Sequence, residues 1–222
     1  MSSNPRPASA EPLPRGRHKL SRGFVRNSQR TRLLQAIQEE ISERGYAATT
    51  VADVVARARV SRNAFYQLFA DKEDCFLASC DESSAEVLEA LYAQISDRTW
   101  TDALRNGLRI YLHWWQDSPE FAVAYMVDLQ TAGRRALEQR DRAHERFAAM
   151  FDALAERARV EQPKLPRLPE LATRLLVNGI TELVGQEVRA GRLKNLEALE
   201  DELMYLIVKA LADERTAQRV AG

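Results

Sequence analysis

The chain has 222 residues, and its 32 Lys and Arg balance 32 Asp and Glu, so the formal net charge is zero. This balance argues against a protein that coats nucleic acid through bulk positive charge, although a local basic patch remains compatible with DNA binding. The sequence contains no apolar run of about 18 residues and no hydrophobic secretory segment at its N-terminus. We therefore expect a cytoplasmic protein.

Proline placement predicts an all-α fold of about nine helices. Four prolines crowd the first 14 residues, and only Pro119 interrupts the chain before residue 163. Proline breaks both helices and strand ladders, so its absence permits long regular elements, and Ala, Leu, Glu and Arg favour helix. The apolar spacing and capping residues predict helices at about 28–44, 51–58, 61–69, 71–96, 101–117, 119–131, 134–159, 169–190 and 196–215.

Residues 1–26 are predicted to form a flexible basic arm. The first 27 residues carry six basic side chains and one acidic one, a net +5, with few apolar residues to bury. Residues 28–80 carry seven charges of each sign, and 81–222 carry 19 positive against 24 negative, or −5. Two interpretations of the arm stay open: a solubilising linker, or a segment that follows the minor groove of DNA.

Residues 50–69 read as a helix-turn-helix, in which a second short helix projects far enough to enter the major groove. Thr50 and Ser61 can cap the two helices. At the start of the second helix, Arg62 can pair with guanine and Asn63 with adenine, and Tyr66 can reach a phosphate. The predicted DNA-binding residues are Thr50, Arg59, Ser61, Arg62, Asn63, Tyr66 and Lys72.

Over about residues 27–87 the sequence resembles the TetR family of transcriptional regulators. The resemblance rests on Gly45-Tyr46, Thr49-Thr50-Val51, Val60-Ser61, Phe65-Tyr66, Phe69 and Lys72-Glu73. It implies a DNA-binding domain at 27–87, a ligand-binding and dimerisation domain at 88–222, and a homodimer that binds a palindromic operator until a small molecule releases it. One residue departs from the family pattern: Arg59 stands where glycine is common, and a left-handed backbone there would cost about 1–2 kcal/mol.

Aromatic residues are concentrated between residues 100 and 151. Ordinary core packing is one interpretation of this cluster, and a mostly apolar ligand pocket with a few polar groups is the other. The candidate pocket residues are Tyr111, Trp114, Trp115, Phe121, Tyr125, His144, Phe147, Phe151, Asn178 and Glu182. Such a lining suits an apolar or aromatic effector, and no cofactor or metal is expected.

The last two predicted helices have the apolar pattern of a dimer seam. The helix at 169–190 is apolar on more than one side, which indicates burial against its own subunit and against a partner. The candidate interface residues are Leu171, Leu175, Leu199, Leu203 and Leu206.

A ligand-released repressor is therefore the predicted function, with a helical sensor or carrier without a repressor role as the alternative. An enzyme is disfavoured because the sequence has no nucleophile elbow, phosphate-binding glycine loop or metal-ligand cluster. Cys75 and Cys80 are five residues apart in a predicted helix and point in different directions, which argues against a disulfide and a redox sensor. Arg outnumbers Lys 27 to 5, a bias typical of GC-rich bacteria such as actinobacteria.

Overall fold

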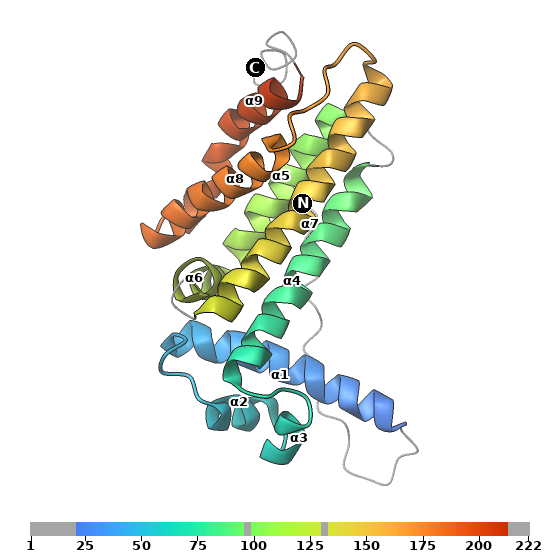
Figure 1. The fold of residues 1–222 in the computed structure, drawn as a ribbon. Coiled ribbons are helices and arrows are strands. Elements are labelled where there is room, and N and C mark those ends of the chain that lie inside the picture. Colours follow the sequence, from blue (N-terminus) through green and yellow to red (C-terminus); the bar gives the residue numbers. More distant parts are fainter. Residues whose placement is uncertain (1–20, 96–98, 130–132, 213–222) are drawn as a thin grey trace. The chain divides into compact units, whose positions relative to one another are not determined.

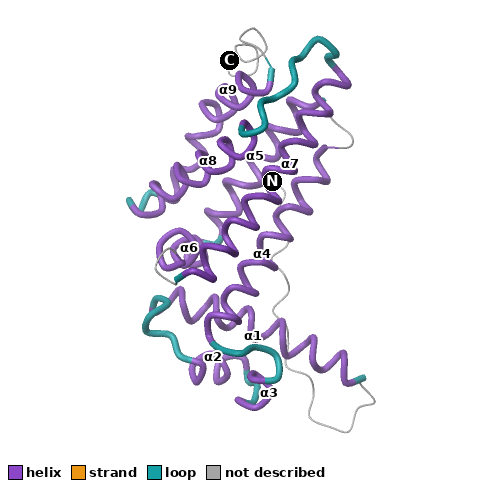
Figure 2. Tube along the Cα trace, in the orientation of Figure 1, coloured by secondary structure: helices purple, strands orange, loops and turns teal. Residues whose placement is uncertain are grey.

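The computed structural model describes residues 21–95, 99–129 and 133–212. These residues form helices joined by loops, and no strand occurs among them (Figure 2). The chain divides into two compact units, residues 1–79 and 80–222. The first unit therefore ends eight residues before the domain boundary that the sequence suggested. None of the described helices is long and apolar enough to cross a membrane.

The N-terminal unit contains α1 (Arg22–Arg44), α2 (Val51–Ala58), α3 (Arg62–Tyr66) and the first residues of α4 (Lys72–Ile95). Its core joins the apolar face of α1, including Leu33 and Ile37, to Phe65 of α3 and Phe76 of α4, all fully buried. In Figure 1, α1 and α2 lie next to each other, in agreement with their many close backbone approaches. This small core fixes the orientation of α3.

Helix α1 begins six residues earlier than predicted. The Ser21 hydroxyl caps it by accepting a hydrogen bond from the Phe24 amide at 3.2 Å. The expected arm at 1–26 therefore ends in helix from residue 22 onwards, and residues 1–20 lie outside the described part of the chain. The capping serine was the available signal, and it was missed because only two large apolar residues, Phe24 and Val25, lie between it and Leu33.

The C-terminal unit is a layered helical domain. It contains the rest of α4, α5 (Trp100–Asp117), α6 (Pro119–Val123), α7 (Arg134–Glu161), α8 (Ala172–Arg189) and α9 (Glu200–Leu211). Helix α5 packs against α7 and α9, and α8 packs against α7 and α9 (Figure 1). The nine predicted α-helices are confirmed over the described residues, with boundaries shifted by a few positions.

Two segments depart from simple α-helix. The predicted sixth helix is α-helical only to Val123 and continues as a π-helix at Ala124–Asp128, which contains the buried Tyr125 and Met126. The predicted ninth helix is preceded by a 3₁₀ segment at Leu193–Leu199 and becomes α-helical at Glu200. Single π turns inside helices are often found at functional sites, and Tyr125 here lines the pocket described below.

Candidate nucleic-acid interface and apolar pocket

Helix α3 presents a polar face to solvent because its apolar face is anchored in the core. The Ser61 hydroxyl caps the helix by accepting from the Ala64 amide at 3.1 Å. Phe65 is fully buried, whereas Arg62, Asn63 and Tyr66 are exposed. The predicted base-reading pair thus lies on the open first turn of α3. The helix itself ends at Tyr66, so Leu68 and Phe69 follow in a turn; Phe69 is buried and Leu68 half-buried.

Arg62 and Tyr66 also contact each other. The Arg62 guanidinium carbon lies 5.9 Å from the centre of the Tyr66 ring, within the range of a cation–π interaction. The Tyr66 ring in turn meets Phe65 edge-on at 5.3 Å. A chain of contacts from the core to the exposed guanidinium therefore restricts the rotamers of Arg62, which lowers the entropy cost of a later contact.

The first turn of α2 is closed by a complete capping box. Thr50 accepts from the Asp53 amide at 3.3 Å, and the Asp53 carboxylate accepts from the Thr50 amide at 3.0 Å and from its hydroxyl at 2.5 Å. These hydrogen bonds with Thr50 lower the pKa of Asp53. The capping role predicted for Thr50 is confirmed, and its phosphate contact stays a prediction.

Arg59 adopts the left-handed conformation that its position demanded. Its φ of 51° and ψ of 45° make it the one non-glycine residue with positive φ in the described chain. Arg32 of α1 compensates for this turn, because its guanidinium donates to the carbonyl oxygens of Ala58 at 2.9 Å and Arg59 at 3.3 Å. The sequence did not reveal Arg32, since only the fold brings it to the end of α2.

Lys72 has a structural role that the sequence analysis did not foresee. Its ammonium donates to the backbone oxygens of Tyr46 at 2.6 Å and Thr49 at 2.8 Å, and it lies 4.1 Å from the centre of the Tyr46 ring. Burial lowers the pKa of Lys72. The side chain thereby holds the loop that leads into α2, and its predicted phosphate contact would be additional to this role.

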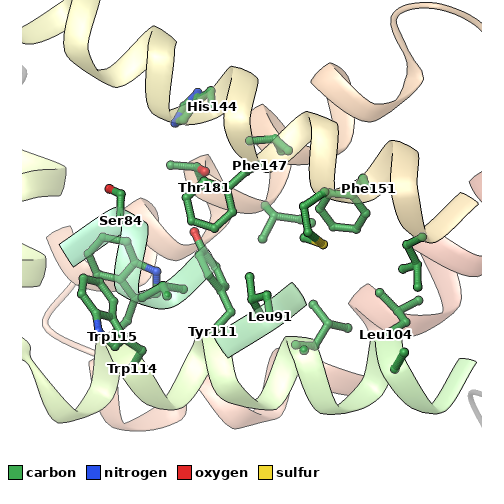
Figure 3. Close-up of a pocket in the computed structure, with 18 of the residues that line it drawn as sticks. Ser84, Leu91, Leu104, Tyr111, Trp114, Trp115, His144, Phe147, Phe151 and Thr181 are labelled. Atoms are coloured by element: carbon green, nitrogen blue, oxygen red, sulfur yellow. The ribbon is translucent and has the colours of Figure 1, made fainter. Parts of the chain in front are cut away.

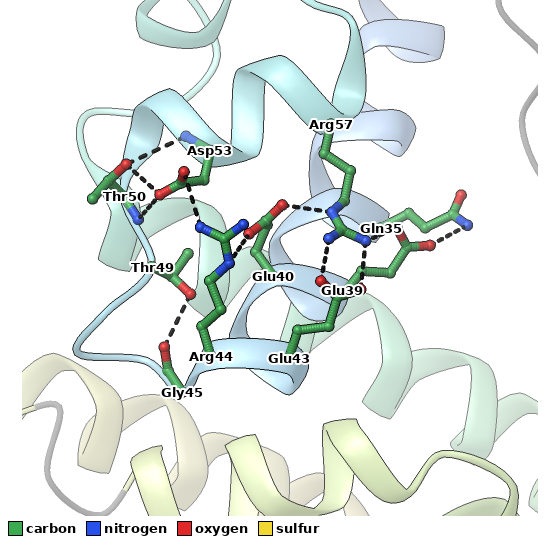
Figure 4. A network of polar contacts seen from close by, with 10 residues as sticks. All are labelled: Gln35, Glu39, Glu40, Glu43, Arg44, Gly45, Thr49, Thr50, Asp53 and Arg57. Atoms are coloured by element: carbon green, nitrogen blue, oxygen red, sulfur yellow. Dashed lines mark hydrogen bonds and ion pairs between the residues drawn. The ribbon is translucent and has the colours of Figure 1, made fainter.

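Arg57 binds α2 to α1 through three carboxylates (Figure 4). Its guanidinium contacts Glu43 at 2.5 Å, Glu40 at 2.6 Å and Glu39 at 3.3 Å. Glu40 is only 4% exposed and also pairs with Arg44 at 3.3 Å. Hydrogen bonds to Glu43 and then to Glu40 raise the pKa of Arg57, so the cation persists at every physiological pH. This cluster sets the position of α2 and was missed because its members are 14 to 18 residues apart.

In the C-terminal unit, α4, α5, the π-helix, α7 and α8 enclose an apolar pocket of about 70 Å³ (Figure 3). Eight of the ten predicted pocket residues line it: Tyr111, Trp114, Trp115, Phe121, Tyr125, His144, Phe147 and Phe151. Trp114 and Trp115 both contribute, with their rings edge-on and 4.7 Å apart. Among the described residues that line the pocket there is no Asp, Glu, Lys or Arg.

The other two predicted members, Asn178 and Glu182, are exposed on α8 and do not line the pocket. The reason is helical phase, since Val177, Ile180 and Thr181 occupy the inward face instead. Glu182 pairs with Arg189 at 2.5 Å. Asn178 supports the pocket indirectly, because its Oδ1 lies 3.1 Å from Nδ1 of His144. Ser84 and Thr181 are polar lining residues that the sequence analysis missed.

The predicted dimer residues divide into two groups. Leu171, Leu175 and Leu206 are exposed, and Leu175 is 70% exposed. Leu183 is exposed as well, and we call these four leucines, which lie on or next to the packed helices α8 and α9, the leucine face. Leu199 is half-buried, whereas Leu203 is only 4% exposed and belongs to the core of its own subunit. Leu203 is therefore withdrawn from the predicted interface residues.

No group of three or more His, Cys, Asp or Glu side chains in the described chain could hold a metal ion. Cys75 and Cys80 are both buried and not joined in a disulfide. Burial raises the pKa of the Cys75 thiol, which makes it a poor nucleophile. These observations weaken the redox alternative.

The exposed first turn of α3, held by the short helix α2, has the geometry of a helix-turn-helix motif. Residues 33–79 match the family model for bacterial regulatory proteins of the tetR family. Over these residues, which are the greater part of the N-terminal unit, the chain is similar to the DNA-binding part of such regulators.

Solved structures share the fold. FadR from Bacillus subtilis, a transcriptional regulator in complex with stearoyl-CoA, has a TM-score of 0.71 and 19% identity over 81% of this chain and 98% of its own. FadR from Bacillus halodurans, a fatty acid degradation regulator, has a TM-score of 0.72 and 17% identity, and the match covers 80% of this chain and 97% of that protein. SmeT, the repressor of a multidrug efflux pump of Stenotrophomonas maltophilia, has a TM-score of 0.66 and 19% identity, and the match covers 82% of this chain and 89% of SmeT. No curated protein matches the sequence.

Proposed function

We propose that this protein is a repressor that binds a palindromic operator as a homodimer and leaves it when a small apolar molecule enters the pocket. The observation that carries this proposal is the pairing of an outward-facing polar turn on α3 with an enclosed apolar pocket in the other unit. Arg62 and Asn63 would read base edges, while Thr50, Arg59, Ser61, Tyr66 and Lys72 would contact phosphates and fix the register.

The leucine face supports the dimer. Exposed leucines on two packed helices are costly in a monomer, and a partner copy would cover them through an isologous contact. Two copies would place two recognition helices about one helical turn of DNA apart, near 34–36 Å. The effector would act by favouring a state in which this spacing is wrong, so operator and effector would weaken each other's binding.

The effector class follows from the lining and has support from one neighbour. FadR from Bacillus subtilis was solved with stearoyl-CoA, a molecule with a long apolar chain. The pocket of the present protein is likewise lined by apolar and aromatic side chains. An acyl chain or an aromatic molecule of similar polarity suits this lining.

Anisotropy binding to an inverted repeat near the protein's own gene tests the proposal. We expect tight salt-dependent binding by the wild type, and loss of both dimer and operator affinity in Leu175→Glu, which places a charge on the most exposed residue of the leucine face. Leu137→Glu, at an exposed leucine of α7 outside that face, is the matched control. A Leu175→Glu variant that remains dimeric in light scattering would contradict the assigned interface.

A further inference from the structure

The pocket is apolar except for a small number of polar atoms, and one of these is in an unusual state. His144 of α7 lines the pocket, and its Nε2 atom is buried without a hydrogen-bond partner among the described residues. An unpaired buried polar atom is unfavourable because it has lost its hydrogen bonds to water, so such atoms in native proteins require an explanation. A ligand that completes the hydrogen bond is one explanation.

The tautomer of His144 decides what kind of ligand group that would be. The Asn178 amide nitrogen donates to the backbone oxygen of Arg174 at 2.8 Å, which turns the Asn178 Oδ1 towards the histidine. Oδ1 can only accept, so the His144 Nδ1 at 3.1 Å must carry the proton. In the neutral ring Nε2 is then an acceptor. Burial lowers the pKa of His144, and so does the charge of Arg140. Asn178 and Asp141 raise it by less, so the pKa is lowered overall and the neutral ring is favoured.

The rest of the lining excludes a charged group at this depth. No cation or anion is present among the described lining residues, so a buried carboxylate or phosphate would have no counter-charge. The other polar groups are neutral: the hydroxyls of Ser84, Tyr111, Tyr125 and Thr181, and the indole N–H groups of Trp114 and Trp115. The N–H of Trp115 lies near enough to the Tyr111 hydroxyl to affect its pKa but forms no hydrogen bond of normal geometry.

From these contacts we propose that the pocket binds an uncharged, mainly apolar molecule whose hydroxyl group donates a hydrogen bond to Nε2 of His144. Asn178 is the positioning residue, because it holds the proton on Nδ1 from outside the pocket. This inference rests on the proposed function, since it names the effector class of the same pocket. The proposed ligand group is thus an uncharged hydroxyl, in contrast to the charged carboxylate of a fatty acid.

Three probes of nearly equal size, small enough for the pocket, test the proposal: 1-butanol, 1-methoxypropane and butanoate. The alcohol can donate, the ether can only accept, and the carboxylate is charged. Calorimetry and tryptophan fluorescence at pH 8 should show the alcohol binding about five- to tenfold more tightly than the ether, the size of one net hydrogen bond. Butanoate should bind at least tenfold more weakly than the alcohol.

Variants assign that preference to the histidine. His144→Phe should bind alcohol and ether equally, and His144→Gln, which restores an amide oxygen, should recover part of the difference. His113→Phe is the matched control, since His113 is exposed and lies outside the pocket. Thermal unfolding confirms that each variant is folded.

The positioning role has its own readout. In ¹⁵N-histidine NMR spectra of the wild type, Nε2 of His144 should have the shift of an unprotonated ring nitrogen. Asn178→Ala should move it towards the protonated form and reduce the preference for the alcohol, and Asn178→Asp should preserve both.

The outcomes separate the two proposals. Equal binding of alcohol and ether to the wild type, or tighter binding of butanoate, would overturn the hydrogen-bond inference and leave an apolar effector pocket intact. Failure of all three probes to bind would contradict the effector pocket as well. A preference for the alcohol that survives in His144→Phe would show that another group accepts the hydroxyl.

Discussion

The two units of this protein use polar side chains in opposite ways. In the N-terminal unit, ion pairs and caps hold short helices in place: Arg57 joins three carboxylates, and Lys72 binds two backbone oxygens. In the C-terminal unit, the functional candidate is a pocket whose described lining has no charged residue and in which rings pack edge to face, as Tyr111 does with Phe147. Ion pairs also join helices of the C-terminal unit, where Arg105 and Arg109 of α5 contact Glu200 of α9, but they lie outside the pocket lining. Polar contacts therefore fix the geometry of the small N-terminal core, whereas apolar and aromatic packing shapes the pocket.

The largest effect is expected when the ion pairs between Arg57 and its three carboxylates are broken. Arg57→Met should lower the free energy of unfolding by about 3 kcal/mol, because Glu40 would remain buried with only the longer contact to Arg44. Arg134→Met, which removes an exposed pair on α7, should cost less than about 0.5 kcal/mol. Denaturant unfolding measures both.

The double variant Arg57→Met with Glu40→Met sharpens this comparison. It should recover most of the lost stability, because no buried charge is then left unpaired. A loss of similar size in the single and double variants would mean that side-chain packing, and not charge, is what Arg57 contributes.

The next effect concerns specificity on α3. Arg62→Ala or Asn63→Ala should each lose about 1–3 kcal/mol of discrimination between operator and altered sites, since each side chain can pair bidentately with one base. Unfolding should hardly change, because both residues are exposed. Competition binding with single base changes measures this, and unaltered sequence preference would refute the assigned contacts.

A smaller effect on stability is expected at Arg59, where one substitution can distinguish backbone strain from a DNA contact. Arg59→Gly should raise the free energy of unfolding by about 1 kcal/mol, because glycine adopts the left-handed conformation without steric cost. If Arg59 also contacts phosphate, operator affinity and its salt slope should fall in the same variant. Higher stability with unchanged DNA binding would limit Arg59 to the turn.

The smallest effect is a pH dependence in the C-terminal unit. Burial lowers the pKa of His144 below its ordinary value of 6.5. The stability that the folded protein gains from keeping this ring neutral is therefore fully present above pH 6.5. That stability is lost as the pH falls below 6.5 towards the folded-state pKa, because the unfolded chain binds the proton first. His144→Phe should flatten this part of the stability profile, while His113→Phe should preserve it. A profile unaffected by His144→Phe would show that other groups dominate.

The sequence by itself determined the features that depend on neighbours along the chain. The helix positions, the capping roles of Thr50 and Ser61, and the motif of α2 and α3 follow from local spacing and capping chemistry. Most of the aromatic lining was also predictable, because large rings in amphipathic helices must be buried somewhere.

Only the tertiary structure decided which distant side chains meet. It placed Arg32 at the carbonyls of Ala58 and Arg59, Lys72 on the loop before α2, and Leu203 inside the subunit core. It also moved Asn178 from the pocket lining to a position behind His144. These contacts depend on which way each side chain faces around its helix and on how the helices cross. Because residues two positions apart point to nearly opposite sides of a helix, an error of two residues places a side chain on the wrong face.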